Sequence, residues 1–332
     1  MKSAIVGCGL ISSIHMEALK NCPNAELIAC CDIIQERSEM SAAQYGAAAY
    51  TDLETMLDAE KPDVLHICTP HYLHVPMAQM AAARGIHIFS EKPAAISKEQ
   101  MDAFMLLEKQ VEIGICFQNR YNLENAYIKE LIDSSALGEI KGARAFVTWD
   151  RDKSYYATGQ WRGKWQSEGG GVLINQSIHT MDLLVYFLGK PVSVKASYDN
   201  YRLKETIEVE DTLMAYIRFE KGAAIFYATN AYVANSPIFM EITGEKGVVS
   251  ANGKKMTVQC SDKKIEAPDF QAQSILGKDY WGAGHETCIL DFYRCLEAGE
   301  KFPICLSNAA ATTYLMLAAY ESAKTGIEVY LQ

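Results

Sequence analysis

The sequence lacks the features that would place the protein on a nucleic acid or in a membrane. It has no clustered stripe of Lys and Arg and its formal net charge is −10, whereas a nucleic-acid surface needs clustered basic side chains to displace phosphate counterions. No uncharged apolar run approaches the roughly 20 residues that span a bilayer. No apolar leader with a cleavage site precedes the first predicted strand. We therefore expect a cytoplasmic protein that binds neither nucleic acid nor a membrane.

The cysteine pattern does not indicate a disulfide framework. The ten cysteines include the adjacent pair Cys30 and Cys31 inside an apolar run, which is typical of small buried hydrophobic side chains in a reducing compartment. With 332 residues, of which 49% are hydrophobic, the chain can bury a substantial core and is long enough for two domains.

The beginning of the sequence has the pattern of a strand, a glycine turn and a helix. Residues 4–6 are apolar, Gly7 and Gly9 follow, and a helical pattern begins after them. The two glycines would let the backbone turn sharply and approach a pyrophosphate, whose charge the amides at the helix start would stabilise. A full motif of this kind has a third glycine where this sequence has Ser12, so an ordinary turn stays open as the alternative.

An acidic residue follows the second predicted strand. Asp32 ends the apolar run 27–31 and lies 25 residues beyond Gly7. A carboxylate at this place accepts the ribose hydroxyls of an adenosine and repels a 2′-phosphate, which favours NAD over NADP. The alternative is that Asp32 caps a helix beginning near Gln35. Because Asp32 follows the glycine turn, we favour ribose binding.

A later strand ends abruptly in an acid, a lysine and a proline. Residues 86–89 are largely apolar, and Pro93 cannot donate to a sheet ladder, so the strand must end before it. Strand and helix patterns alternate over residues 4–117, which predicts a parallel, doubly wound sheet. Ligands bind at the carboxyl ends of the strands in such a sheet. Lys92 is therefore the leading candidate for a functional residue.

Two histidines follow the strand that ends at Thr69 and Pro70. His71 and His74 form an H-x-x-H pair. Two histidines at the start of a helix more often make backbone or cofactor contacts, so we predict no metal there.

The alternation of strands and helices ends after Arg120. Later segments, among them 212–219 and 223–229, are rich in β-forming residues and joined by short polar turns such as 220–222, which predicts hairpins and an antiparallel sheet. If one sheet face packs on helices, the other needs a cover, so we expect a homo-oligomer. The apolar segment 307–324 is expected to be a core helix.

A triple glycine at 169–171 precedes a group of polar residues. Asn175, His179 and Asp182 are spaced by four and three residues, so a helix would place them along one face. A histidine held by a carboxylate has the fixed tautomer that proton transfer requires. The alternative is a polar stripe in a satisfied helix.

Taken together, these segments resemble the Gfo/Idh/MocA oxidoreductases, named for glucose-fructose oxidoreductase, inositol dehydrogenase and a rhizopine-catabolism protein. The resemblance covers nearly the whole chain, and Glu91-Lys92-Pro93 is its most specific segment. The other segments that carry it are Gly7-Cys8-Gly9, Cys68-Thr69-Pro70, Gln118-Asn119-Arg120, Trp161-Arg162-Gly163, the triple glycine and Gly326-Ile327-Glu328-Val329.

The resemblance implies an α/β protein with an N-terminal Rossmann domain, whose doubly wound parallel sheet occupies residues 1–118. It implies a C-terminal α+β domain over residues 119–332, with a large, mostly antiparallel sheet that forms homodimers or homotetramers. It also implies Lys92 as the proton-transfer residue, His179 as its partner, and NAD as the cofactor. The expected cofactor-binding residues are Gly7, Gly9, Leu10, Ile11, Asp32, Thr69, Pro70, His71, His74, Glu91, Lys92, Gln118 and Arg162.

One position departs from the family pattern. Many family members have Asp where this chain has Asn175, and an amide cannot ionise. We therefore assign Asn175 to the catalytic group as a residue that orients the substrate or His179. A proton relay through position 175 is not expected, which shifts the proton chemistry to Lys92 and His179.

Oxidation of a secondary alcohol requires a base on the hydroxyl as hydride moves to the nicotinamide. An unperturbed lysine, with a pKa of about 10.4, is a poor base at neutral pH, but partial burial and the nicotinamide charge should lower that pKa for Lys92. Neighbouring residues of a strand point to opposite faces, so Glu91 should lie away from the Lys92 ammonium.

We predict an NAD-dependent dehydrogenase that oxidises a secondary hydroxyl of a sugar, a cyclitol or a derivative. One alternative is a glycosidase that oxidises and reduces its substrate transiently through NAD. The other is a non-catalytic NAD or ligand sensor, against which the presence of both Lys92 and His179 speaks.

Overall fold

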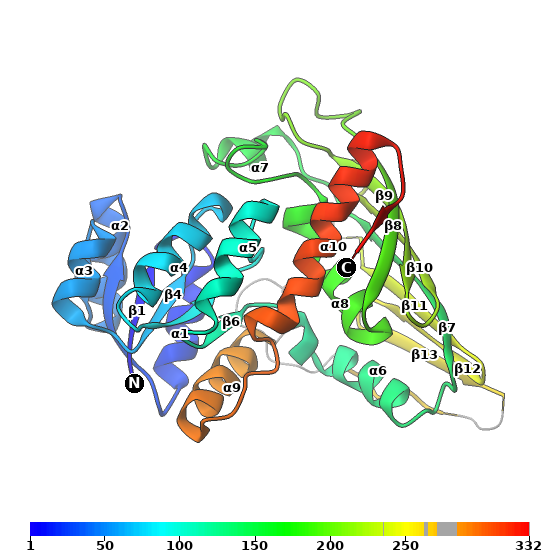
Figure 1. Cartoon of the computed structure of the whole chain (residues 1–332), viewed down its shortest axis with the longest axis horizontal. Helices are drawn as coiled ribbons and strands as arrows, with labels where there is room; N and C mark the ends of the chain where they lie inside the picture. Colours follow the sequence, from blue (N-terminus) through cyan, green and yellow to red (C-terminus); the bar gives the residue numbers. More distant parts are fainter. Residues whose placement is uncertain (235, 262–264, 271–283, 332) are drawn as a thin grey trace. The chain divides into compact units, whose positions relative to one another are not determined.

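The structure, a computed structural model, describes residues 1–234, 236–261, 265–270 and 284–331 (Figure 1). The chain divides into two compact units. The first contains Met1–Tyr121 and Ser274–Ala310, and the second contains Asn122–Gln273 and Ala311–Gln332. The predicted boundary after residue 118 lies three residues before the first division. The predicted second domain differs in one respect, because residues 284–310 return to the first unit.

The first unit contains a parallel six-stranded sheet in the order β3-β2-β1-β4-β5-β6. The order reverses between β1 and β4, which is the switch point at which doubly wound sheets bind their ligands. The predicted parallel sheet is thereby confirmed. Only the short edge strand β3 escaped prediction, because three residues carry too little pattern. The strands are β1 (Lys2–Val6), β2 (Glu26–Cys31), β3 (Ala48–Tyr50), β4 (Val64–Ile67), β5 (His87–Ser90) and β6 (Ile113–Ile115).

Helices cover this sheet, and local sequence sets several of their ends. Asp52 caps α3 by accepting a hydrogen bond from the Thr55 amide, and Ser97 caps α5. A left-handed Gly46 ends α2. The helices are α1 (Ser12–Asn21), α2 (Gln35–Tyr45), α3 (Leu53–Glu60), α4 (His74–Ala82) and α5 (Lys98–Leu107), with 3₁₀ turns η1 (His71–Leu73) and η2 (Gln118–Tyr121).

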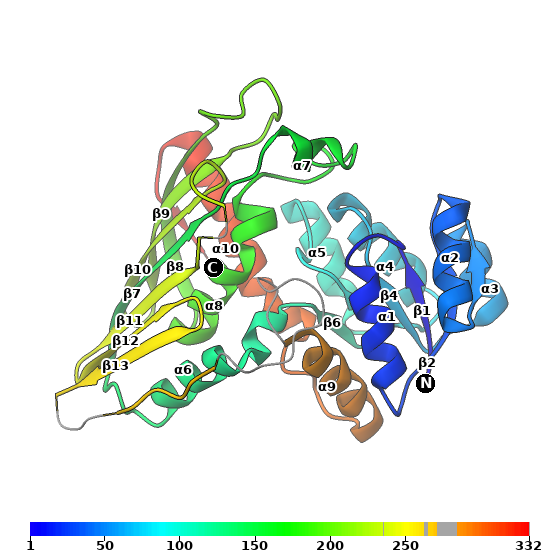
Figure 2. The same cartoon turned by 180° about the vertical axis from the view of Figure 1, so that it is seen from behind.

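Helix α9 (Gly284–Ala298) also belongs to the first unit. It lies beside α1 in both views (Figures 1 and 2). Phe292 and Tyr293 on α9 are fully buried, and the Phe292 ring centre lies 5.1 Å from that of Phe89 on β5. The core of the first unit therefore depends on a helix that is distant from β5 in the sequence.

The second unit contains an eight-stranded sheet in the order β13-β12-β11-β7-β10-β9-β8-β14. The pair β7 and β10 is parallel and the other described pairs are antiparallel. The predicted hairpin at 212–229 is confirmed. The strands are β7 (Ile140–Thr148), β8 (Pro191–Asp199), β9 (Thr212–Phe219), β10 (Ala223–Thr229), β11 (Phe239–Gly244), β12 (Gly247–Asn252), β13 (Lys255–Cys260) and β14 (Val329–Tyr330).

One face of the larger sheet packs on helices, with α8 and α10 lying along it (Figure 2). The opposite face exposes large apolar side chains, because β9 alternates buried and exposed residues. Met214 is 60% exposed, Tyr216 49% and Ile225 56%. The helices are α6 (Leu123–Asp133), α7 (Lys153–Ala157), a π-helical turn (Leu173–Ser177), α8 (Ile178–Leu188) and α10 (Leu306–Thr325), which begins in the first unit.

All ten cysteines are free thiols, as predicted. Among the described residues, the helices are too short or too polar to cross a bilayer.

Candidate active site

The glycine turn and Asp32 meet at the carboxyl edge of the parallel sheet. The Gly7 amide donates to the Cys31 carbonyl at 2.8 Å, and the Cys8 amide donates to Asp32 Oδ2 at 2.8 Å. The second carboxylate oxygen of Asp32 accepts from the Ile34 amide at 2.9 Å. The N-cap residue of α2 is Ile34 and not Asp32. The helix-cap alternative for Asp32 is therefore wrong, and its ribose contact stays a prediction.

The two glycines of the turn are required for different reasons. Gly7 has φ +89°, and a Cβ there would lie 2.6 Å from the Cys68 carbonyl oxygen, so the fold itself demands glycine. A Cβ at Gly9 would meet no heavy atom within 4 Å. Packing within the protein does not explain Gly9, whereas the close approach of a dinucleotide pyrophosphate does. The residues of the turn therefore fit the predicted cofactor.

Exposed apolar side chains flank the turn. Leu10 is 73% exposed, Ile33 88% and Ile34 41%, which is the kind of surface that an apolar ring system covers. Ser12 stands where a full motif has its third glycine. It is buried, and its hydroxyl donates to the Gly9 carbonyl at 2.7 Å, so the substitution closes the turn instead of disrupting it.

His74 joins the two loops that follow β4 and β5. Its Nδ1 lies 2.8 Å from the Pro93 carbonyl oxygen and its Nε2 lies 2.9 Å from that of Thr69. Burial lowers the pKa of His74, although both carbonyls favour the charged ring. The structure therefore gives His74 the backbone contacts that were expected, and these brace the segment that contains Lys92. His71 is also buried, in η1 with its ring centre 5.8 Å from that of His74.

Lys92 is half-buried and is the second residue after β5. Gln118 lies beyond the neighbouring strand β6 and is buried, within 3.8 Å of the Cys116 sulfur. The parallel pairing of β5 and β6 brings these two strand ends to the same edge. The sequence did not predict the buried contact that Glu91 makes. Its carboxylate is buried and contacts His15, a residue that was not among the predicted sites.

In the second unit, Asn175 lies on the π-helical turn before α8. Its amide nitrogen donates to the fully buried carboxylate of Glu168 and lies 3.4 Å from the Tyr155 hydroxyl. An aspartate at position 175 would face the Glu168 carboxylate and repel it. Asn175 is therefore explained by its hydrogen bond to the carboxyl group of Glu168, a residue earlier in the chain.

Arg162 lies in the same unit, stacked between two aromatic rings. Its guanidinium carbon is 4.8 Å from the ring centre of Trp161 and 5.0 Å from that of Tyr155. The Tyr155 hydroxyl also lies 3.1 Å from the amide nitrogen of Gln176. We call Tyr155, Arg162, Glu168, Asn175 and Gln176 the polar cluster of the second unit.

The triple glycine allows close packing beneath this cluster. Glu210 is fully buried, and its carboxylate accepts from the amides of Gly171 and Leu173 and from the Tyr320 hydroxyl at 2.8–3.0 Å. A Cβ at Gly171 would lie 1.9 Å from the Glu210 carbonyl oxygen, and one at Gly170 would lie 2.0 Å from the Tyr320 hydroxyl. Burial raises the pKa of Glu210 to about 7.

His179 is half-buried on the first turn of α8. Asp182 is fully buried one turn later and accepts a hydrogen bond from the Thr312 hydroxyl at 2.7 Å. The turn before α8 is π-helical, so the spacing of 175, 179 and 182 does not follow one regular helix. The proton-transfer role of His179 stays a prediction.

Residues 1–115 match the family model described as "Oxidoreductase family, NAD-binding Rossmann fold", and residues 125–250 match the GFO/IDH/MocA C-terminal domain. The chain belongs to the Gfo/Idh/MocA family. Its parallel sheet, glycine turn and antiparallel sheet agree with the architecture that the resemblance implied.

Several members of this family are similar over most of the chain. D-Glucoside 3-dehydrogenase of Escherichia coli is 29% identical over 69% of this chain and 70% of the relative. scyllo-Inositol 2-dehydrogenase (NAD⁺) of Bacillus subtilis is 26% identical over 100% of this chain and 96% of the relative. The WlbA dehydrogenase of Bordetella pertussis, solved with NADH and UDP-GlcNAcA, has a TM-score of 0.90 at 28% identity and covers 100% of this chain and 98% of that one.

This Gfo/Idh/MocA protein is therefore an NAD-binding oxidoreductase of the dehydrogenase class that acts on CH–OH groups. The recognition of the family from its short motifs is confirmed, and so is the cofactor.

Proposed function

We propose that the protein oxidises a secondary hydroxyl of a sugar, a cyclitol or a derivative of either, with Lys92 as general acid/base and His179 as its partner. The observation that carries the proposal is the position of Lys92. It is half-buried at the end of β5, at the same sheet edge as the open space beside Gly9. The relatives named for glucosides and inositols, and the similar structure solved with UDP-GlcNAcA, support a polyhydroxylated ring as the substrate.

In this proposal NAD, when bound, accepts the hydride from the carbinol carbon. The turn that contains Gly7 and Gly9 holds the pyrophosphate, and the Asp32 carboxylate accepts hydrogen bonds from the ribose hydroxyls. The neutral amine of Lys92 takes the hydroxyl proton at Nζ as the C–O bond becomes a carbonyl, and His179 orients that hydroxyl. Asn175 offers no proton, because its amide is committed to Glu168.

The test is NADH absorbance with the purified protein, NAD and a panel of sugars, cyclitols and glycosides. We expect NADH to accumulate with at least one polyol. In Lys92→Ala the rate of NADH formation should fall by more than about a hundredfold, as is typical when a general acid/base is removed. Cleavage of a glycoside without NADH accumulation would instead support the glycosidase with transient NAD cycling. NAD binding without turnover of any compound would support the sensor.

Cofactor binding has its own test at the glycine turn. Gly9→Ala adds a methyl group where no protein atom lies within 4 Å, so the melting temperature without NAD should stay within a degree or two. NAD affinity measured by fluorescence quenching should fall by tenfold or more, since the methyl group would occupy the space left for the pyrophosphate. Unchanged NAD affinity would remove the turn from the cofactor site.

We also propose a cytoplasmic homodimer or homotetramer. The ten free thiols support a reducing compartment, and the exposed apolar face of β9 and β10 supports a subunit interface. Light scattering should give at least a dimer for the native protein. Ile225→Asp, a charge placed on that face, should give monomers, and a monomeric native protein would reject the interface.

A further inference from the structure

A chain of buried polar side chains runs through the first unit. The Ser3 hydroxyl lies 2.6 Å from the Tyr293 hydroxyl, which lies 2.8 Å from His66 Nε2. His66 Nδ1 lies 2.9 Å from His15 Nδ1, and His15 Nε2 lies 3.0 Å from Glu91 Oε1. All five residues are at most 6% exposed. We call them the buried polar chain; it connects β1, α9, β4 and α1 to the end of β5.

The contact between His15 and Glu91 and the burial of both histidines indicate which ring of this chain carries the charge. The Glu91 carboxylate accepts a hydrogen bond from His15 Nε2, and the two facing Nδ1 atoms of His15 and His66 need one proton between them. Burial alone would lower the pKa of His15, but hydrogen bonds with Cys116 and Glu91 raise it to about 9. Burial lowers the pKa of His66 well below its ordinary value. His15 is thus the charged ring and donates to the neutral His66.

The same carboxylate reaches the predicted catalytic lysine. Glu91 Oε2 accepts a hydrogen bond from the backbone amide of Lys92 at 3.2 Å. Burial would raise the pKa of Glu91, but the His15 imidazolium holds it well below its usual range. Glu91 therefore stays ionised although it is buried, and the backbone of Lys92 is hydrogen-bonded to a buried anion.

A buried anion beside a lysine has a cost for base catalysis. A negative charge within a few ångströms favours the ammonium form, which cannot accept a proton. The positive charge of His15 opposes this effect, because the pair His15 and Glu91 is neutral as a whole. The pair can then hold the Lys92 backbone without holding the proton on Lys92.

We propose that His15 is a positioning residue for Lys92. The His15 imidazolium neutralises Glu91, so that this carboxylate anchors the Lys92 backbone amide without stabilising the Lys92 ammonium. The inference rests on the proposed role of Lys92 as the base. It assigns a functional reason to a histidine on the buried side of α1.

Six other titratable groups face this pair in the described part of the first unit, and the pKa shifts of five of them keep those five uncharged at neutral pH. Burial lowers the pKa of His285 to about 4 and also lowers that of His74. Burial raises the pKa of Cys68 and of Cys116. The groups are His66 on β4, Cys68 after it, His74 on α4, Cys116 after β6, and His285 and Cys288 on α9.

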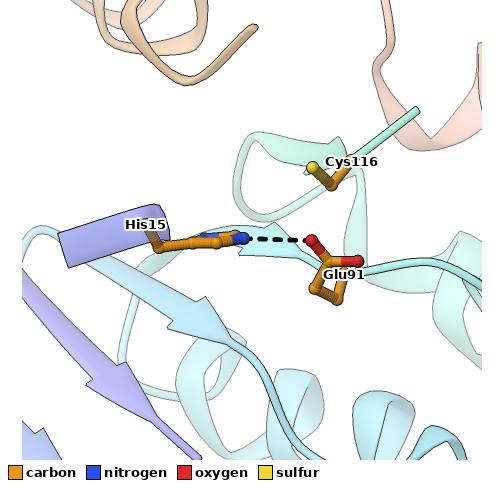
Figure 3. Close-up of side chains that lie close together, drawn as sticks. All are labelled: His15, Glu91 and Cys116. Carbon is orange, nitrogen blue, oxygen red and sulfur yellow. Dashed lines mark hydrogen bonds and ion pairs between the residues drawn. The ribbon is translucent and has the colours of Figure 1, made fainter. Parts of the chain in front are cut away.

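A metal ion is the competing interpretation of part of this arrangement. Figure 3 shows the Cys116 sulfur beside the His15 and Glu91 side chains, and one donor atom from each lies within 4.8 Å of the others. The 3.0 Å contact between His15 and Glu91 already satisfies both groups as an ion pair. Metal analysis of the purified protein therefore belongs to the test.

The first experiment measures Lys92 itself and needs no turnover. The rate at which trace acetic anhydride acetylates Lys92 is followed against pH by peptide mass spectrometry, with the exposed lysines as internal references. His15→Gln should raise the midpoint of that profile by about one pH unit, which is a roughly tenfold loss of Lys92 reactivity at pH 7. His15→Gln/Glu91→Gln should restore the native midpoint, because both charges are then removed. His66→Gln, a neutral change in the same chain, should leave the midpoint in place.

The midpoint of the pH profile of kcat/KM should shift upward in His15→Gln and stay in place in His15→Gln/Glu91→Gln and in His66→Gln. An unchanged midpoint in His15→Gln would overturn the inference, and so would a stoichiometric metal ion in the native protein. If His15→Gln does not fold, ¹⁵N NMR of the native histidine rings decides, since a neutral His15 at pH 7 would equally overturn it. Full turnover in Lys92→Ala would instead reject the proposed function, which separates the two failures.

Discussion

Two buried carboxylates in this protein are stabilised in opposite ways. Glu91 in the first unit faces the His15 imidazolium, which holds its pKa well below the usual range against the effect of burial. Glu210 in the second unit faces two backbone amides and the Tyr320 hydroxyl, and burial raises its pKa to about 7. Glu91 accepts hydrogen bonds from His15 and the Lys92 amide at 3.0 and 3.2 Å, and Glu210 accepts three at 2.8–3.0 Å. Neutral donors therefore do not compensate burial as a charged partner does.

The two environments also serve different ends. The charged pair lies next to Lys92, where a fixed charge state matters for proton transfer. Glu210 braces the triple glycine and the turn before α8, where geometry matters and charge does not. The comparison predicts that removing a partner costs more in the first unit than in the second.

The largest effect should come from breaking the charged pair. His15→Leu leaves the Glu91 carboxylate buried without a counter-charge, which should lower the free energy of unfolding by about 3–5 kcal/mol. Urea denaturation at pH 7 measures this change. His15→Leu/Glu91→Leu should recover most of the loss, since an apolar pair of similar volume replaces the ion pair. Equal losses in the single and double variants would show that packing, and not charge, holds this region.

The pH dependence of the same pair has a defined sign. The pKa of His15 is raised to about 9 when folded, so its stabilising contribution is complete below its unfolded value of about 6.5 and is lost as pH rises through 9. Glu91 has a lowered pKa, so its contribution is lost as pH falls below about 4.5. The pair should therefore be most stabilising between about pH 4.5 and 6.5.

Glu210 should have the opposite pH dependence. Its pKa is raised from 4.5 to about 7 in the folded state, so folding favours the protonated acid and stability falls as pH rises from 4.5 through 7. A shift of this size corresponds to about 3 kcal/mol. Glu210→Gln should flatten the dependence of the unfolding free energy between pH 5 and 8. If the native and variant profiles stay parallel, Glu210 is ionised throughout and the contrast with Glu91 disappears.

Much of this arrangement could be predicted from local sequence, and the exceptions are instructive. The hairpin at 212–229 was predictable because alternation fixes which residues of β9 face inward. The roles of His15, Glu168 and Glu210 were not, because each depends on a partner brought in by tertiary packing. Tyr293 is an example: it lies 227 residues from His66, its hydrogen-bond partner.

Helix α9 has a clear local signal in the sequence. Cys288, Ile289, Phe292 and Tyr293 recur at helical spacing and are all buried, which is the pattern of an amphipathic helix. Its assignment to the first unit, however, follows from tertiary contacts with α1, η2 and β5. Periodicity identifies a helix but does not tell which sheet the helix covers.

A smaller effect should sharpen the contrast at the polar cluster. Asn175→Asp would place a second carboxylate against Glu168, which now accepts a hydrogen bond from the Asn175 amide. Like charges in a buried site raise the pKa of one of them, so we expect a loss of about 2 kcal/mol at pH 8 and a smaller loss at pH 5. Thermal melting at the two pH values measures both.

The matched control exchanges the two groups. In Glu168→Gln/Asn175→Asp, the glutamine nitrogen can donate to the new carboxylate at position 175 while its oxygen still accepts from the Gly163 amide, as Glu168 does now. The melting temperature should then return to within a few degrees of the native value at both pH values. Recovery would show that one negative charge, on either residue, is what this site accommodates. Failure of the exchange would mean that Glu168 is needed at its own position, and Asn175 would no longer be explained by charge alone.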